Sequence, residues 1–161
     1  MYDALTLASP ENLNEIFAMY RRCADCSEHS WGEDYPYLEI VEEDIALGAL
    51  YVLRDSTGSL LAAGALRDGA ELAHLPWDPA YRRPCELNRL GVSPACQHRG
   101  IGAKMLSLLL DKAAALGYDS MILLAAKANA PALALYQKLG FSTCGETHCY
   151  DTDFYCLQRA L

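Results

Sequence analysis

The chain has 161 residues, 52% of them hydrophobic, and a formal net charge of -8. This length and composition predict one compact folded domain over residues 1–161. Nucleic acid and anionic membranes are disfavoured as main partners, because the negative charge would repel both. The charge is uneven: residues 1–85 hold fifteen Asp and Glu against six Lys and Arg, and residues 86–161 hold six against seven. The acidic half suits a cationic partner, although a solvated acidic face would give the same counts.

The start of the chain and its cysteines point to a cytoplasmic protein. Met1–Pro10 lacks the basic start and the long apolar stretch of a secretory signal. The seven cysteines include two close pairs, Cys23 with Cys26 and Cys144 with Cys149. No histidine stands where it would complete a zinc-ligand pattern, so we predict free thiols, no metal and no disulfide framework.

The first half of the chain predicts a strand, two helices and a hairpin. Ser9-Pro10-Glu11 is typical of a helix start, with a hydroxyl cap, a proline in the first turn and an early carboxylate. Asp55–Gly58 has the turn chemistry of a hairpin. The second helix is expected to bury Leu38, Val41 and Ile45 and to expose Glu42, Glu43 and Asp44. The elements are a strand over 2–7, a helix from 9 carrying Leu13, Ile16, Phe17 and Tyr20, a loop over 27–37, a helix over 36–47, and strands over 49–54 and 60–67.

The second half changes to a strand–helix–strand order. The predicted elements are strands over 85–92, 120–126, 141–146 and 153–159, and helices over 100–116 and 130–139, the last stopped by Gly140. An antiparallel front followed by a βαβ unit predicts a mixed α/β (α+β) fold. We expect a mostly antiparallel sheet of six to seven strands, helices on both faces and a central βαβ unit.

The segment Gln97–Ala103 lies between a predicted strand and a long amphipathic helix. A helix start leaves four backbone N–H groups without intrahelical partners, and the helix dipole makes that end positive. Gly100 and Gly102 would let a phosphate approach the backbone, although glycines of an ordinary turn would give the same pattern. The spacing is not that of a P-loop and lacks the third glycine of the dinucleotide fingerprint.

Two motifs in this half closely resemble the GCN5-related N-acetyltransferase (GNAT) superfamily. The first runs through Leu87–Pro94, with a hydrophobic strand ending in Val-x-Pro, and continues as Gln97-x-x-Gly-x-Gly102. The second is formed by Asn129, Ala132, Leu135-Tyr136, Lys138 and Leu139-Gly140-Phe141. The resemblance covers residues 85–146, and the front half matches mainly in the order of its elements.

This resemblance implies an acetyl-CoA-dependent N-acetyltransferase with an acyl-CoA site in the βαβ unit and no metal. Carried over by position, the backbone of Leu90, Gly91 and Val92 would meet the pantetheine arm, and Asn129 and Tyr136 would lie against the cofactor. The pyrophosphate would be held by Gln97, His98, Arg99, Gly100, Ile101, Gly102 and Ala103, with Lys104 adding positive charge.

The implied reaction is direct attack of a neutral amine on the thioester. Tyr136 stands at the family's position for the group that protonates the departing thiolate, although a packed core tyrosine would show the same spacing. Glu86 is the candidate base, and a chain of water molecules is the alternative. Strand alternation places Glu86, Asn88, Leu90 and Val92 on one face unless a bulge interrupts it.

The acceptor is expected to be an amine of a small molecule or peptide bound by loop residues. Aromatic and acidic side chains suit a cation, and the loops offer Trp31, Glu33, Asp34, Tyr35 and Trp77. The same aromatics could instead close the core beneath the loop. The alternative function is a noncatalytic acyl-CoA-binding sensor or regulatory module, and the expected assembly is a monomer or a homodimer.

Overall fold

The computed structural model describes residues 4–26 and 31–161, and these form two compact units. The first unit contains Met1–Leu66 and Asn88–Leu109, and the second contains Arg67–Leu87 and Leu110–Leu161. The described residues hold seven strands, four α-helices and three short 3-10 turns. The strands are β1 Thr6–Leu7, β2 Leu50–Arg54, β3 Leu60–Asp68, β4 Pro84–Val92, β5 Ser120–Ala126, β6 Ser142–Cys149 and β7 Thr152–Ala160. The α-helices are α1 Leu13–Cys26, α2 Leu38–Ala46, α3 Ile101–Ala115 and α4 Ala130–Lys138.

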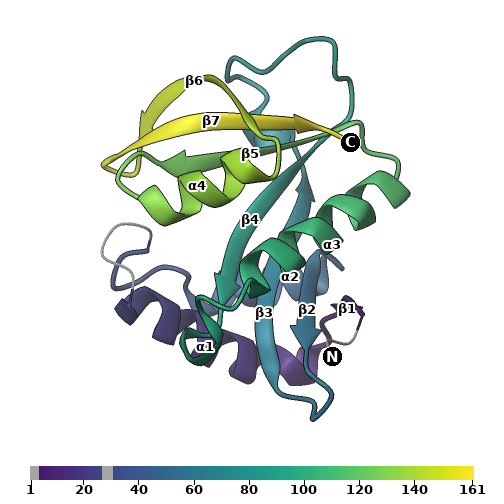
Figure 1. Cartoon of the computed structure of the whole chain (residues 1–161), viewed down its shortest axis with the longest axis vertical. Helices are drawn as coiled ribbons and strands as arrows, with labels where there is room; N and C mark the ends of the chain where they lie inside the picture. Colours follow the sequence, from purple (N-terminus) through teal and green to yellow (C-terminus); the bar gives the residue numbers. More distant parts are fainter. Residues whose placement is uncertain (1–3, 27–30) are drawn as a thin grey trace. The chain divides into compact units, whose positions relative to one another are not determined.

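All seven strands belong to one mixed sheet, in the order β1-β2-β3-β4-β5-β7-β6 (Figure 1). β4 pairs with β5 in parallel, whereas β1 with β2, β2 with β3, β5 with β7 and β6 with β7 are antiparallel. The first half of β4 belongs to the second unit and its second half to the first unit. The predicted mixed, mostly antiparallel sheet of six to seven strands is therefore confirmed.

The first unit is built around the buried faces of α1 and α2 and the apolar strands of the hairpin. Its core includes Ile16, Met19, Tyr20, Val41, Ile45, Leu50, Val52, Ala63 and Ala65. The predicted first strand is shorter than expected within the described residues, since β1 holds only Thr6 and Leu7. The side chain of Asp44 was expected to be exposed, but it is fully buried. Asp44 follows Val41 by three residues, so helical spacing turns both toward the interior.

The second unit includes the antiparallel strands β5, β7 and β6, with α4 drawn beside them in Figure 1. Its buried apolar side chains include Met121, Ile122, Leu123, Phe141 and Leu157. The last two strands are longer than predicted and form a hairpin. Tyr150 and Asp151 between them have φ angles of 52° and 54°, and two such residues in succession suit the right-handed twist of paired strands.

The buried Gln158 side chain holds the loop before β4 in the second unit. Its amide nitrogen donates to Ser120 Oγ at 3.0 Å, and its Oε1 accepts from the backbone N–H of Asp78 at 2.9 Å. Because a buried amide without partners would be costly, these hydrogen bonds favour one position of the loop.

Candidate functional site

The N-terminus of α3 has the geometry of an anion-binding site. Gly100 lies just before the helix with φ 78°, a left-handed conformation that glycine adopts without strain, and it is exposed. The N–H of Lys104 donates to the Gly100 carbonyl at 3.0 Å. The N–H groups of Ile101, Gly102 and Ala103 come before this first hydrogen bond of the helix. They therefore lie at the positive end of α3, which has 15 residues.

The side chains around this helix start are neutral or basic. Arg99 and Lys104 are exposed, and the first turn of α3 contains no acidic residue. His98 has φ 64°, so the chain turns sharply before the helix. Gln97 is exposed, and its side chain donates to the Val92 carbonyl at 3.3 Å, which ties this loop to the end of β4. The arrangement favours a negatively charged group at the helix start.

The end of β4 is packed tightly against α1 and the loop after it. A Cβ atom at Gly91 would lie 3.0 Å from Trp31 Cη2 and 3.1 Å from the ring of Tyr20, so only glycine fits there without displacement. The Val92 carbonyl also accepts a hydrogen bond from Cys23 Sγ at 3.1 Å. Burial raises the pKa of the Cys23 thiol to about 11, so it remains a protonated donor at neutral pH.

Sequence reasoning missed a buried ion pair in the first unit. Arg89 Nε donates to Asp44 Oδ2 at 2.6 Å, and Arg89 Nη2 donates to Asp44 Oδ1 at 2.8 Å. The exposed fraction of the side chain is 6% for Arg89 and 0% for Asp44. The signal was present in the sequence, since the spacing of Val41, Asp44 and Ile45 places a carboxylate in the buried stripe of α2, where it needs a cationic partner.

The candidate acceptor residues of the first unit form part of a chain of aromatic contacts. Trp31 lies edge-on to Tyr20, with ring centroids 5.2 Å apart, and to Tyr35, with ring centroids 6.4 Å apart. Glu33 and Asp34 are exposed, and the backbone carbonyl of Glu33 accepts a hydrogen bond from Arg21. The structure therefore brings Trp31 and Tyr35 into contact, with Trp31 beside Gly91, and leaves the two acidic side chains open to solvent.

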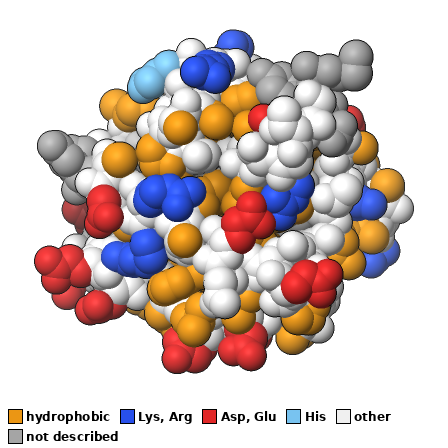
Figure 2. Space-filling model, turned by 90° about the horizontal axis from the view of Figure 1, so that it is seen from below, with side chains coloured by type: hydrophobic (Ala, Val, Ile, Leu, Met, Phe, Trp, Pro, Cys, Tyr) orange, Lys and Arg blue, Asp and Glu red, His pale blue; other side chains and the backbone are white. Residues whose placement is uncertain are grey.

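The face of the molecule drawn in Figure 2 carries charges of both signs. Acidic side chains lie mainly toward its left and lower edges, and Lys and Arg side chains lie nearer the centre and the right. The net charge of residues 1–85 therefore does not make this face uniformly negative. Any attraction of a cation would depend on the nearest carboxylates, because salt screens charges beyond about 8 Å.

The second unit holds the candidate proton donor. Tyr136 lies in α4, half-buried, with its ring 5.5 Å from that of Phe141. Burial raises the pKa of the Tyr136 hydroxyl to about 12, so it stays protonated throughout the neutral range. At the start of α4, Asn129 Oδ1 accepts a hydrogen bond from the N–H of Ala132 at 3.3 Å, so this side chain caps the helix.

Two further predicted residues also lie in the second unit. Glu86 is half-buried in β4 and is paired in register with Ile122 of β5. Trp77 is held by its own loop, because its indole N–H donates to the Leu72 carbonyl at 2.7 Å. These contacts describe each residue's local setting, and the roles of Glu86 as a base and of Trp77 as an acceptor contact stay predictions.

Residues 4–26 and 31–161 lack two features that would indicate a metalloprotein or a membrane-spanning helix. This part of the chain contains no group of three or more His, Cys, Asp or Glu that could hold a metal ion. It also contains no helix whose length and hydropathy would let it cross a membrane. The seven cysteines, all within the described ranges, are free thiols.

Comparisons with known proteins agree on one family. A family model described as "Acetyltransferase (GNAT) family" matches residues 13–141. Mycothiol acetyltransferase of Clavibacter michiganensis subsp. michiganensis is 42% identical over 82 residues, which are 51% of this chain and 26% of that protein. The chain therefore spans about a quarter of the length of this curated relative.

Solved structures share the fold over almost the whole chain. A GNAT family acetyltransferase of Streptococcus agalactiae has a TM-score of 0.83 at 19% identity, covering 99% of this chain and 95% of that one. The yncA protein of Salmonella typhimurium, solved with its cofactor acetyl-CoA, has a TM-score of 0.71 at 21% identity, covering 98% and 93%. At these identities, the likeness shows the fold.

Proposed function

Because the chain belongs to the acetyltransferase (GNAT) family and is thereby an acyltransferase, we propose that it moves an acetyl group from acetyl-CoA to a primary amine. The whole of residues 1–161 is proposed to act as one acetyltransferase domain. The family model supports this, since residues 13–141 include parts of both compact units. The curated relative, a mycothiol acetyltransferase, supports acetyl transfer as the reaction class.

The observation that carries the proposal is the start of α3. The backbone N–H groups of Ile101, Gly102 and Ala103 lie at the positive end of α3, and the first turn of this helix contains no acidic residue. This is a suitable place for the pyrophosphate of acetyl-CoA without a metal ion, because backbone dipoles and helix charge both favour an anion. Arg99 and Lys104 are proposed to add charge, and Gln97, His98 and Gly100 to shape the loop.

The pantetheine arm is proposed to lie along the end of β4, in contact with the backbone of Leu90, Gly91 and Val92. The Val92 carbonyl already accepts hydrogen bonds from Cys23 and Gln97, so Leu90 and Gly91 are expected to make the main contacts. A backbone N–H near Leu90 would stabilise the oxyanion that forms when the amine attacks the thioester. Asn129, which caps α4, is proposed to contact the same arm.

Two proton transfers complete the proposed reaction. The attacking amine loses a proton, for which Glu86 or a chain of water molecules is the proposed acceptor. The departing thiolate gains a proton from the Tyr136 hydroxyl. The raised pKa of Tyr136 supports this role in one respect, because the hydroxyl keeps its proton until the thiolate forms. Because the thiolate is a weaker base than the phenolate of Tyr136, this proton transfer would be slow unless the hydroxyl lies close to the thiolate.

The acceptor is proposed to be a cationic amine of a small molecule or peptide. Exposed Glu33 and Asp34 would attract an ammonium group, and Trp31 and Tyr35 offer ring faces for cation–π contacts. Trp77 is proposed as a further contact. Polyamines, aminoglycosides and peptide N-termini are therefore expected to react faster than acidic amino acids.

The test measures turnover of acetyl-CoA with a panel of amines. Turnover is detected as release of free thiol and as the mass of the acetylated product. Acetylation of one or more cationic amines is expected, with a higher acceptor KM at high salt. Tyr136→Phe should lower kcat by roughly 10²-fold or more while the affinity for acetyl-CoA is kept. Tight binding of acetyl-CoA without any thiol release would instead indicate the noncatalytic sensor.

A further inference from the structure

One residue of β4 departs from strand geometry. Arg89 has φ 53°, in the left-handed region that side-chain-bearing residues seldom adopt. The inward side chains nevertheless keep alternating, since Cys85 and Leu87 are buried and the Arg89 side chain is only 6% exposed. The departure therefore lies in the backbone conformation of Arg89. Glu86, Asn88, Leu90 and Val92, which were expected on one face of the strand, are all half-buried.

A strained conformation persists only where the surroundings hold it, and here the holding group is Asp44. Its two carboxylate oxygens accept from Nε and Nη2 of Arg89, at 2.6 Å and 2.8 Å. Burial by itself would lower the pKa of Arg89, but the hydrogen bonds to Asp44 raise it above its usual value, so the guanidinium is charged. The planar fork of Arg89 fits both oxygens at once, which fixes its orientation.

The third nitrogen of the same guanidinium contacts the loop that carries Trp31 and Tyr35. We call this loop the acceptor loop, because both residues are proposed to contact the acceptor amine. Arg89 Nη1 donates to the Tyr35 hydroxyl at 2.9 Å. The ring of Tyr35 lies against Trp31, and Trp31 approaches the position of a Cβ at Gly91. The loop is thus joined to β4 on both sides of Leu90, by a hydrogen bond at residue 89 and by ring packing at residue 91.

We propose that Arg89, oriented by Asp44, is a positioning residue for acyl transfer: its backbone sets the direction of the Leu90 and Gly91 peptide groups, and its side chain holds Tyr35 of the acceptor loop. This inference rests on the proposed function, in which those peptide groups meet the thioester. The pair shares no residue with the proposed anion site at Ile101 to Ala103, so binding of the pyrophosphate is not expected to depend on it.

The variants distinguish the position of the Arg89 guanidinium from its charge and from its effect on folding. Arg89→Lys keeps the charge but offers one point of contact in place of the fork. The double substitution Asp44→Asn with Arg89→Gln removes both charges, so no unpaired charge is left buried. This double variant is used if Arg89→Lys is poorly folded. Tyr35→Phe removes only the hydrogen bond to the loop. Arg54→Lys is the matched control, since Arg54 makes a similar two-point contact with Glu15 at an exposed position.

The measurements are kcat, the KM of each substrate, the dissociation constant of acetyl-CoA, and the amide resonances of Leu90 and Gly91. For Arg89→Lys we expect kcat to fall by about 10- to 100-fold and the acetyl-CoA dissociation constant to stay within about 3-fold. The two amide resonances should move in Arg89→Lys and stay in place in Arg54→Lys. Tyr35→Phe should raise the acceptor KM by about 2- to 10-fold with little change in kcat.

A folded Arg89→Lys or double variant with the kcat of the native protein and unmoved amide resonances would overturn the inference. So would a parallel loss of acetyl-CoA affinity and stability with kcat retained, because that result indicates a purely structural pair. A native protein that transfers acetyl to no amine would refute the proposed function instead. The amide resonances would still decide whether Arg89 sets the backbone of β4.

Discussion

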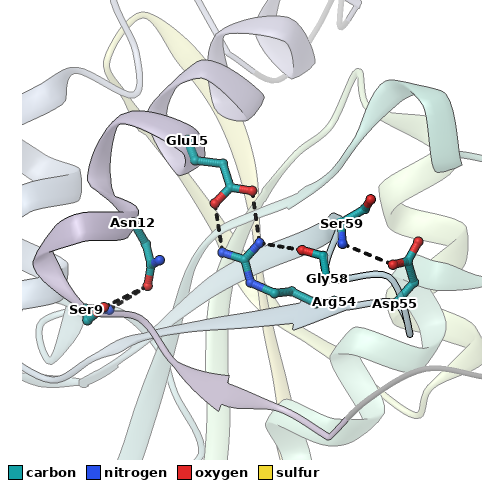
Figure 3. A network of polar contacts seen from close by, with 7 residues as sticks. All are labelled: Ser9, Asn12, Glu15, Arg54, Asp55, Gly58 and Ser59. Atoms are coloured by element: carbon teal, nitrogen blue, oxygen red, sulfur yellow. Dashed lines mark hydrogen bonds and ion pairs between the residues drawn. The ribbon is translucent and has the colours of Figure 1, made fainter.

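Among the described residues of the first unit, two arginine–carboxylate pairs join a helix to a strand, and they differ in exposure. Arg54 of β2 donates to both oxygens of Glu15 of α1, at 2.9 Å and 2.8 Å, as Figure 3 shows. Its side chain is 23% exposed and that of Glu15 is 47% exposed. The pair of Arg89 in β4 with Asp44 in α2 has the same two-point geometry but is almost completely buried.

The difference shows that similar contacts can have very different consequences. The exposed pair gains little, because water solvates each charge nearly as well, and such pairs contribute about 0–1 kcal/mol. The buried pair adds little net stability either, but loss of one partner leaves an uncompensated charge in the interior. The buried pair therefore fixes one arrangement of α2 and β4, whereas the exposed pair can open without loss of the fold.

Removal of the buried arginine should have the largest effect. Arg89→Ala leaves the carboxylate of Asp44 buried without its cation, so the free energy of unfolding should fall by about 3–5 kcal/mol. Urea unfolding followed by circular dichroism measures this. A loss below about 1 kcal/mol, as expected for Arg54→Ala, would mean that Asp44 is solvated and that the two pairs are equivalent.

An added methyl group beside the buried pair should have an intermediate effect. Gly91→Ala places a Cβ 3.0 Å from Trp31 and 3.1 Å from Tyr20, so the rings must shift. Overpacking of this kind costs about 1–3 kcal/mol, measured as the shift in the unfolding midpoint. Gly32→Ala is the control, since a Cβ there would have no neighbour within 4 Å among residues 4–26 and 31–161. Equal stability of the two variants would contradict the packing of the loop on β4.

The smallest effect is expected at the exposed pair, and it should depend on pH. Hydrogen bonds from Arg54 hold the pKa of Glu15 below its usual value in the folded protein. The stabilisation is then present above the unfolded pKa and is lost as pH falls through the folded pKa. Glu15→Gln should cost about 0–1 kcal/mol at pH 7, and this cost should shrink as pH falls below the usual Glu pKa of about 4.3, as measured by urea unfolding. A cost of Glu15→Gln that grows as pH falls would contradict this prediction.

The arrangement of elements could be predicted from periodicity because most helices and strands bury a regular stripe. Ser120 to Ala126 was predicted instead as a short apolar run; it is buried almost throughout, and its predicted bounds equal the observed ones. The family and the glycines before α3 could be recognised from two local motifs. In contrast, the left-handed backbone of Arg89 goes with a side-chain partner 45 residues away, in α2. No local pattern in β4 indicates such a contact. The position of Asp44 in the buried stripe of α2 was a usable signal, but Asp44 was expected to be exposed.

Acetyl-CoA affinity of the variant Gly102→Val tests the central claim, the placement of the pyrophosphate at the start of α3. Calorimetric titration of the native protein is expected to give a dissociation constant in the micromolar range or better, typical of a co-substrate. Gly102→Val should bind no measurable acetyl-CoA while its fold is kept, because a branched side chain would occupy the space of the phosphate. Ser107→Val, at an exposed position of the same helix, should bind normally. Normal binding by Gly102→Val would contradict the account.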